Sequence, residues 1–301
     1  MTRLNKDAQT GLRDRPQHLQ VTLQKALQDW PQWETGLDEP PSVLGELRNS
    51  AQASSPNRVY LLQAGQSRLL LKLQQRHPVY TPTQAERRTS MALQKAAAVI
   101  RLAPEIIYAC PDRGYLLQAY IDGELLLDRA PEKIIPLKAI CAAMRAYHSM
   151  PNLQGLPAFD YVARCEAYLQ RAKQSLATAT YERFCEGWGE LRSICVAYQD
   201  NADAKRAPCH HDLNRCNILL PADNATGQGV RFIDWEYAGL GLASMDFASL
   251  GVELGITAET LAPISGIAVH ELLGATRIYR FLCAVYMEIL ASAAQKQRLA
   301  L

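Results

Sequence analysis

CHHDLNRCNILLPADNATGQGVRFIDWEYAGLGLASMD, residues 209–246, is the stretch that decides the fold. It places His210, Asp212 and Asn217 in the order H-x-D-x-x-x-x-N, and a short apolar run then ends on Asp234. Phosphoryl transfer needs these groups in this order, because one carboxylate must face the attacking hydroxyl while an amide and a second carboxylate hold magnesium on the phosphates. Polar loop residues also cap turns, but the complete pattern beside a strand favours the chemical interpretation.

Each polar residue of this stretch has an expected role. Asp212 accepts or orients the proton of the substrate hydroxyl, and Asn217 and Asp234 are the expected metal ligands. His210 is a catalytic candidate beside Asp212, where it orients the loop by hydrogen bonds rather than transferring protons. Asp246 is expected near a helix start, where it accepts backbone N–H bonds and supports the loop.

The three residues after the metal carboxylate are candidates for the substrate side. Glu236 could face a second metal ion or a cationic substrate, and the rings of Trp235 and Tyr237 could form a cation–π wall. Core packing is the alternative for at least one of them. Three aromatic residues of the expected C-terminal helix are assigned to the core: Tyr279, Phe281 and Tyr286.

Composition bounds the class of protein. The 301 residues are 48% hydrophobic and 21% charged, which indicates a globular chain long enough for two lobes. A net charge of +2 gives no electrostatic case for nucleic acid or an anionic membrane. No apolar run reaches the roughly 18 uncharged residues of a membrane helix, and the N-terminus has no signal-peptide core, so a cytoplasmic location is expected.

Eight scattered cysteines form no C-x-x-C pair, which indicates reduced, mostly buried thiols. Cys209, His210 and His211 with Cys216 could suggest zinc. Their spacing matches no standard zinc finger, and phosphoryl transfer explains the same loop better.

A strand lysine is the second functional element. Residues 58–74 are expected to form a β-hairpin, with Lys72 among leucines in its second strand. A lysine there must either snorkel or meet an anion. Pairing with Glu86 on the next helix would direct the Lys72 ammonium to the α- and β-phosphates of a nucleotide. The alternative is that the two residues form an ordinary, partly exposed ion pair.

The loop before the hairpin, residues 48–57, is small and polar but lacks glycine. It could close over phosphates through its N–H groups and hydroxyls.

The remaining patterns predict an α+β chain with a small sheet lobe and a larger helical lobe. Expected helices cover 18–30, 81–99 with Thr81 as N-cap and Pro82 at the first position, 134–149, 159–176, 180–200, 244–254 and 270–298. Expected strands, besides one before residue 48 and the hairpin, cover 106–109, 115–120, 218–220 and 230–233. The corresponding domains are an N-terminal extension with a helix (1–42), a nucleotide-binding lobe (43–120) and a catalytic, substrate-binding lobe (121–301).

The sequence resembles the choline kinase and aminoglycoside phosphotransferase family of small-molecule kinases. HHDLNRCNILL and FIDWEYAGLGLASMDFASL carry the likeness, and the second segment is most similar to bacterial choline kinases and thiamine kinases. LLQAYIDGELL resembles the family's linker between the lobes, where backbone groups near Gln118 and Tyr120 would hold adenine. The likeness covers most of residues 43–255.

The resemblance implies a protein-kinase-like fold, ATP and magnesium. By position, it makes Asp212 the catalytic base, Asn217 and Asp234 metal ligands, and Lys72 the phosphate-binding lysine. The chain departs from the family in its glycine-free nucleotide loop. It also lacks the C-terminal tryptophans of many choline sites, since its four are Trp30, Trp33, Trp188 and Trp235.

These observations predict ATP-dependent phosphorylation of a hydroxyl on a small, cationic metabolite, with choline, ethanolamine or thiamine favoured. An aminoglycoside or amino-sugar kinase is the alternative within the class, because one fold serves all these substrates. A nucleotide-binding pseudokinase or regulatory module is the alternative of another class. The acceptor and the oligomeric state are left open.

Overall fold

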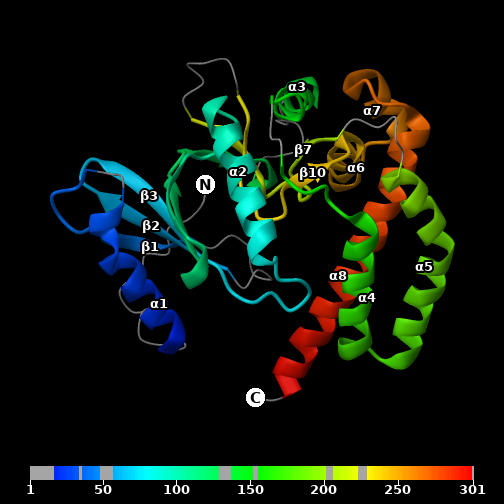
Figure 1. Cartoon of the computed structure of the whole chain (residues 1–301), viewed down its shortest axis with the longest axis horizontal. Helices are drawn as coiled ribbons and strands as arrows, with labels where there is room; N and C mark the ends of the chain where they lie inside the picture. The colour runs from blue at the N-terminus through cyan, green and yellow to red at the C-terminus, as the bar shows by residue number, and fades with distance from the viewer. Residues whose placement is uncertain are drawn as a thin grey trace.

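The protein has a sheet lobe and a helical lobe that lie side by side, as the computed structural model shows (Figure 1). The structure describes residues 17–33, 36–47, 57–128, 137–151, 155–200, 206–222 and 229–299. The predicted α+β architecture with two lobes is confirmed. No helix in these ranges is long and apolar enough to cross a membrane.

The sheet lobe is built on five antiparallel strands in the order β1-β2-β3-β5-β4. Their bounds are Ser42–Leu47, Arg58–Ala64, Ser67–Leu73, Tyr115–Ala119 and Ile106–Cys110 in that spatial order. The predicted hairpin of β2 and β3 is confirmed, and Gly65 makes its tight turn with a φ of +58°. The 3₁₀ helix Pro111–Arg113 joins β4 to β5.

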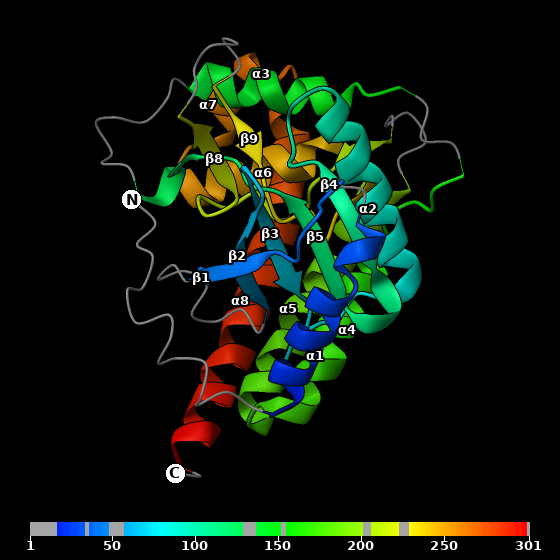
Figure 2. The same ribbon diagram turned by 90° about the vertical axis from the view of Figure 1, so that its left-hand side faces the viewer.

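Alternation along β3 gives the sheet two different faces. Leu69, Leu71 and Leu73 belong to an apolar cluster with helix α1 (Gln17–Gln28) and Trp33, so α1 covers this face (Figure 2). Side chains in a strand alternate between faces, and Lys72 therefore points to the opposite side, toward the helical lobe. The 3₁₀ helix Trp30–Gln32 follows α1, which ends two residues before the expected end at residue 30.

The first residue of helix α2 (Gln84–Val99) lies two positions after Pro82, the first helical residue that the sequence indicated. Thr83 is the N-cap: its hydroxyl accepts from the Glu86 amide, and the Glu86 carboxylate accepts from the Thr83 amide at 2.8 Å. This capping box satisfies two otherwise unpaired backbone donors, so it outweighs the favourable proline at position 82.

The helical lobe contains the helices α3 to α8 and two small sheets. The helices are Leu137–His148, Tyr161–Ser175, Thr178–Gln199, Ala243–Leu254, Ala258–Ser265 and Val269–Leu299. One sheet has the order β6-β8-β9 (Gly123–Leu125, Ile218–Pro221, Arg231–Phe232), and the other pairs β10 (Gly239–Gly241) with β7 (Ala207–Cys209). The 3₁₀ helix Leu126–Asp128 follows β6. The sequence did not predict β6, β7, β10 and α7.

The two small sheets position the residues of the opening stretch. Strand β6 follows the linker between the lobes and pairs with β8, while β9 ends just before Asp234. Strands β7 and β10 bracket the segment that carries Asp212. Below them lies an apolar core in which Tyr147 meets Phe232 and Trp235 edge to face. Short strands on a rigid core therefore hold both polar loops in place.

Candidate active site

The loop after β7 holds Asp212 through two amide side chains. Asn217 Nδ2 donates to Asp212 Oδ2 at 2.9 Å and to the Asp212 carbonyl at 2.8 Å, and Asn214 Nδ2 donates to Asp212 Oδ1 at 3.1 Å. Because the amide nitrogen of Asn217 is engaged, its amide oxygen is the atom that can face a cation. Burial raises the pKa of Asp212 well above its usual value, and the nearby carboxylates Asp234 and Glu236 add to this.

Asp246, in the first turn of α6, braces this loop from below. Its carboxylate accepts from the His210 and His211 amides, each at 2.8 Å, from Tyr147 Oη at 2.7 Å, and contacts His148 Nε2 at 3.1 Å. Burial alone would raise the pKa of Asp246, but the hydrogen bond and charge of His148 lower it well below the usual value. The brace holds His211 at a φ of +61°, a backbone conformation that non-glycine residues rarely adopt.

His210 is fully buried, and its Nε2 lies 2.9 Å from the carbonyl oxygen of Ile233. This contact links the Asp212 loop to the end of the apolar run before Asp234. Burial lowers the pKa of His210, so the ring is neutral at pH 7. The residue is absent from the lining of both cavities described below, which supports the orienting role rather than proton transfer.

The segment after β9 turns sharply at Asp234, whose φ is +64°. Trp235 then points into the core with 1% of its surface exposed, and its indole N–H donates to the Phe232 carbonyl at 2.8 Å. The structure therefore assigns Trp235 to the core, the alternative expected for at least one of these residues, and Trp235 does not line the cavity that contains Asp212. Glu236 and Tyr237 do line the cavity that contains Asp212.

The buried ammonium of Lys72 lies between the carboxylates of Asp234 and Glu236. It contacts Asp234 Oδ1 closely and lies 2.9 Å from Glu236 Oε2. Burial alone would lower the pKa of Lys72, but the two carboxylates raise it above the usual value, so the side chain is charged. The choice that the sequence left open is thereby settled: Lys72 meets anions and does not snorkel.

The predicted pair of Lys72 and Glu86 is not found. Glu86 accepts from Tyr80 Oη at 2.6 Å and pairs with Arg164 Nη2 at 2.8 Å, besides capping α2 at Thr83. The late start of α2 explains the error, because a glutamate at the third helical position turns back to the cap instead of facing the sheet. The assignment of Glu86 to the nucleotide is corrected accordingly.

Two cavities meet at Asp234 and Glu236. One, of about 170 Å³, lies between the sheet and the helical lobe; its lining includes Lys72, Gln118 and Tyr120 as well as both carboxylates. The other, of about 490 Å³, lies in the helical lobe and is lined by Asp212, Asn217 and the same two carboxylates. We call them the small and the large cavity.

The small cavity lies against the linker between the lobes, with Gln118 and Tyr120 in its lining. Gln118 accepts from Gln94 Nε2 at 3.0 Å, and the Tyr120 ring packs under the Arg68 guanidinium at 4.5 Å. The Tyr120 amide donates to the Arg68 carbonyl at 3.2 Å, so a ligand here would use other main-chain groups of the linker. Of the loop 48–57, only Asn57 lies within the described residues.

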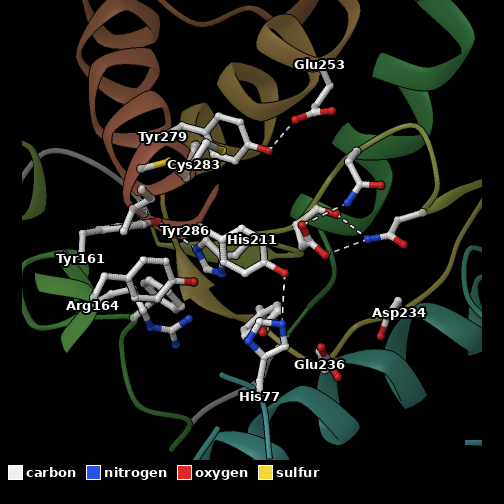
Figure 3. Close-up of a pocket in the computed structure, with 18 of the residues that line it drawn as sticks. His77, Tyr161, Arg164, His211, Asp234, Glu236, Glu253, Tyr279, Cys283 and Tyr286 are labelled. Atoms are coloured by element: carbon white, nitrogen blue, oxygen red, sulfur yellow. Dashed lines mark hydrogen bonds between the residues drawn. The ribbon is translucent and has the colours of Figure 1, made fainter. Parts of the chain in front are cut away.

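The large cavity is walled by tyrosines and histidines, several of which Figure 3 shows around its centre. Tyr279 and Tyr286 of α8 line it, although Tyr279 also belongs to the buried core of the helical lobe, as expected, and Tyr286 packs against a neighbouring core cluster. Phe281 packs on Trp188 beside that core. Tyr279 Oη donates to Glu253 Oε1 at 3.0 Å, and Tyr286 Oη lies 3.0 Å from His77 Nε2 (Figure 3).

Charge in the large cavity is predominantly negative. Its carboxylates are Asp212, Asp234, Glu236 and Glu253, while Arg164 is the cation among its described lining residues. That guanidinium is paired with Glu86 and lies over three rings, those of Tyr80 at 3.9 Å, Phe159 at 4.7 Å and Tyr237 at 5.6 Å. Burial lowers the pKa of His77 and of His211 to about 4, so both rings are neutral at pH 7.

The sequence features that signal this cavity were weak. Several lining residues were not singled out from the sequence, namely His77, Phe159, Tyr161, Arg164, Tyr168 and Glu253. Tyr161, Arg164 and Tyr168 share α4, whereas His77, Phe159 and Glu253 lie elsewhere in the chain, so the packing of α4 against α6 and α8 brings the set together.

The family model for the phosphotransferase enzyme family matches residues 51–282. The chain belongs to this family. The match includes parts of both lobes, most of the lining of both cavities and the two polar loops. No curated protein sequence matches the chain significantly.

Solved structures share the fold of this phosphotransferase at low identity. Choline kinase LicA from Streptococcus pneumoniae is 18% identical, with 92% of each chain covered and a TM-score of 0.63. Aminoglycoside phosphotransferase APH(3'')-Id from Streptomyces rimosus, solved with ADP and streptomycin, is 17% identical over 88% of this chain and 98% of that one, with a TM-score of 0.59. A choline/ethanolamine kinase family protein from Mesorhizobium loti is 20% identical, covers 91% and 87%, and has a TM-score of 0.56.

A zinc site in the phosphotransferase's Asp212 loop finds no support. Within the described ranges, the ligating atoms that come together are those of His148, Cys209 and Asp246, not those of Cys209 with His210, His211 and Cys216. The Asp246 carboxylate in that group is already used as the brace of the loop.

Proposed function

We propose that the protein transfers the γ-phosphoryl group of ATP to a hydroxyl of a small cationic metabolite. The observation that carries the proposal is the shared wall of the two cavities: Lys72 and the linker lie on one side of Asp234, and Asp212 lies on the other. A nucleotide in the small cavity would direct its terminal phosphate to this wall, and an acceptor in the large cavity would approach it from Asp212. Such positioning supplies much of the catalysis in phosphoryl transfer.

The donor set of the wall fits magnesium. Asp234 offers a carboxylate and Asn217 an amide oxygen, which are the hard ligands that this ion takes alongside phosphate and water. The position beside Asp234 is already attractive to a cation, since the Lys72 ammonium lies there. When bound, the ion would supply neutralisation of the charge on the phosphates.

Asp212 would act on the acceptor. Its carboxylate would accept the proton of the acceptor hydroxyl as the hydroxyl oxygen forms a bond to the γ-phosphorus. The bond between the γ-phosphorus and the β–γ bridging oxygen breaks at the same time. The products are a phosphomonoester, ADP and the proton on Asp212. A buried carboxylate with a raised pKa accepts a proton more readily than an exposed one, which suits this role.

The charge balance of the large cavity favours a cationic acceptor. Arg164 is neutralised by Glu86, and Lys72 by Asp234 and Glu236. Glu253 remains as a carboxylate whose described partner is the neutral Tyr279 hydroxyl. An amine or quaternary ammonium would meet this carboxylate and the faces of the surrounding tyrosines. Choline, ethanolamine and thiamine are the preferred candidates.

A screen of ADP production tests the proposal. Choline, ethanolamine, thiamine, amino sugars and aminoglycosides are offered with Mg²⁺ and ATP, and Asp212→Asn serves as the inactive control. We expect one small cationic alcohol to stimulate ADP release, and its phosphomonoester to be detected by mass spectrometry. Stimulation by amino sugars or aminoglycosides alone would favour the alternative acceptor class. Nucleotide binding without stimulation by any compound would favour a binding module.

A further inference from the structure

We propose that Glu236 positions Lys72 by pairing with its ammonium. This is the role that the sequence predicted for Glu86 on α2. Glu236 Oε2 lies 2.9 Å from Lys72 Nζ and accepts from Asn57 Nδ2 at 2.8 Å. The two side chains of the pair are 16% and 10% exposed. A buried ammonium without a counter-ion is strongly unfavourable, so Lys72 needs an anionic partner in every state of the site, including the one without nucleotide.

Helix α2 cannot supply that partner. Its acidic residue near the sheet lobe's edge, Glu86, is held by Thr83, Tyr80 and Arg164 at the start of the helix. The described α2 residues that line the small cavity with Lys72 are uncharged: Ser90, Met91 and Gln94. The Gln94 side-chain nitrogen donates to the Pro104 carbonyl and to Gln118 Oε1, each at 3.0 Å.

Asp234 cannot be the permanent partner either. The inference rests on the proposed function, in which the Asp234 carboxylate turns to a metal ion. Lys72 would then keep one carboxylate, that of Glu236, which Asn57 holds from the other side. Glu236 thereby keeps the ammonium directed at the nucleotide phosphates and away from Asp234.

Chemical labelling of Lys72 tests this pairing without nucleotide, metal or turnover. The full chain is treated with acetic anhydride in EDTA, and acetylation of Lys72 is followed by mass spectrometry. The hydrogen bond to Glu236 holds the Lys72 nitrogen in the pair and away from the reagent, so Glu236→Gln should be acetylated about tenfold faster, the factor to which losing about 1.4 kcal/mol of charged hydrogen bonding corresponds. Glu86→Gln, the matched control, should not change the rate.

A compensating substitution separates positioning from a general structural effect. Ser90 is buried and lines the same cavity as Lys72, so Ser90→Glu places a carboxylate on α2 facing it. In the Glu236→Gln background it should slow acetylation again and restore kcat at least several-fold, with the KM of the acceptor unchanged. If Glu236→Gln does not fold, Glu236→Asp, whose shorter carboxylate lies farther from Lys72 Nζ, should accelerate acetylation in the same direction but less.

Two results would overturn the inference. One is an unchanged labelling rate in folded Glu236→Gln protein, and the other is acceleration by Glu86→Gln instead. Loss of kcat with no change in labelling would assign Glu236 to metal or substrate and also count against it. The labelling result stands even if no acceptor is phosphorylated, so failure of the proposed function is recognised separately.

Discussion

Arg164 of the helical lobe and Glu86 of the sheet lobe form an ion pair across the interface, with Nη2 and Oε1 2.8 Å apart. The guanidinium also lies over the Tyr80 ring at 3.9 Å. Arg164 is 7% exposed and lines the large cavity, whereas Glu86 lies in the first turn of α2. The pair therefore joins the start of α2 to the wall of the proposed acceptor site.

Removing this guanidinium should destabilise the protein. For Arg164→Leu we expect the free energy of unfolding to fall by about 2 kcal/mol, because a desolvated cation–π contact and a charged hydrogen bond are lost together. Urea denaturation measures the change. Arg192→Leu is the control, since Arg192 and Glu166 are exposed and 3.4 Å apart, and should cost less than about 1 kcal/mol. Equal effects of the two substitutions would contradict the assignment.

Glu253 should govern recognition of the acceptor and not of ATP. For Glu253→Gln we expect the KM of a cationic acceptor to rise about tenfold, the effect of losing roughly 1.4 kcal/mol of charge pairing, with the KM of ATP unchanged. Tyr279→Phe removes only the hydroxyl that donates to Glu253 and should have a smaller effect. Steady-state kinetics with each substrate varied in turn gives both constants. A parallel rise in the KM of ATP would show that the residue acts on the fold.

Gly241 of β10 should not tolerate a side chain. A Cβ atom there would collide with Tyr161 Oη and the His211 ring, both beside the Asp212 loop. Gly241→Ala should therefore lower the free energy of unfolding by about 1–3 kcal/mol and reduce activity, because overpacking displaces these neighbours. Gly189→Ala, at an exposed position in α5 with open space around it, should instead stabilise by about 0.5–1 kcal/mol. Thermal or urea denaturation of the two variants provides the comparison.

His77 should make stability depend on pH in the acidic range. Its Nδ1 accepts from the Val79 amide at 3.1 Å and its Nε2 contacts the Tyr286 hydroxyl, the titratable group that faces it from α8. Burial lowers its pKa to about 4, against about 6.5 in the unfolded chain. Between these values the unfolded chain binds more protons, so this stability is complete above pH 6.5 and is lost as pH falls toward 4.

The measurement for His77 is urea denaturation from pH 4 to 7. His77→Gln should flatten the slope of unfolding free energy against pH, without abolishing it, because His211 has a similarly lowered pKa. An identical slope in the variant would show that other groups titrate in this window.

The order of groups along the chain was sufficient to predict the two-lobe fold and both polar loops. Hairpins, helix periodicity and the H-x-D-x-x-x-x-N pattern are local, and local geometry follows from them. Asp212 and Asn217 lie five residues apart in one loop, so their contact needed no knowledge of distant packing. The register of Lys72 in β3 was equally readable, because alternation in a strand decides which face a side chain occupies.

Tertiary structure alone decided the partners of each charge. Glu86 and Glu236 were both available to Lys72 by sequence, and the capping box of α2 together with Arg164 determined which one pairs with it. The same holds for the ring of Trp235, which a left-handed turn at Asp234 sends into the core, and for Tyr279 and Tyr286, which the packing of α8 brings to the cavity. Contacts between segments far apart in the chain depend on how helices pack, and no local pattern records that choice.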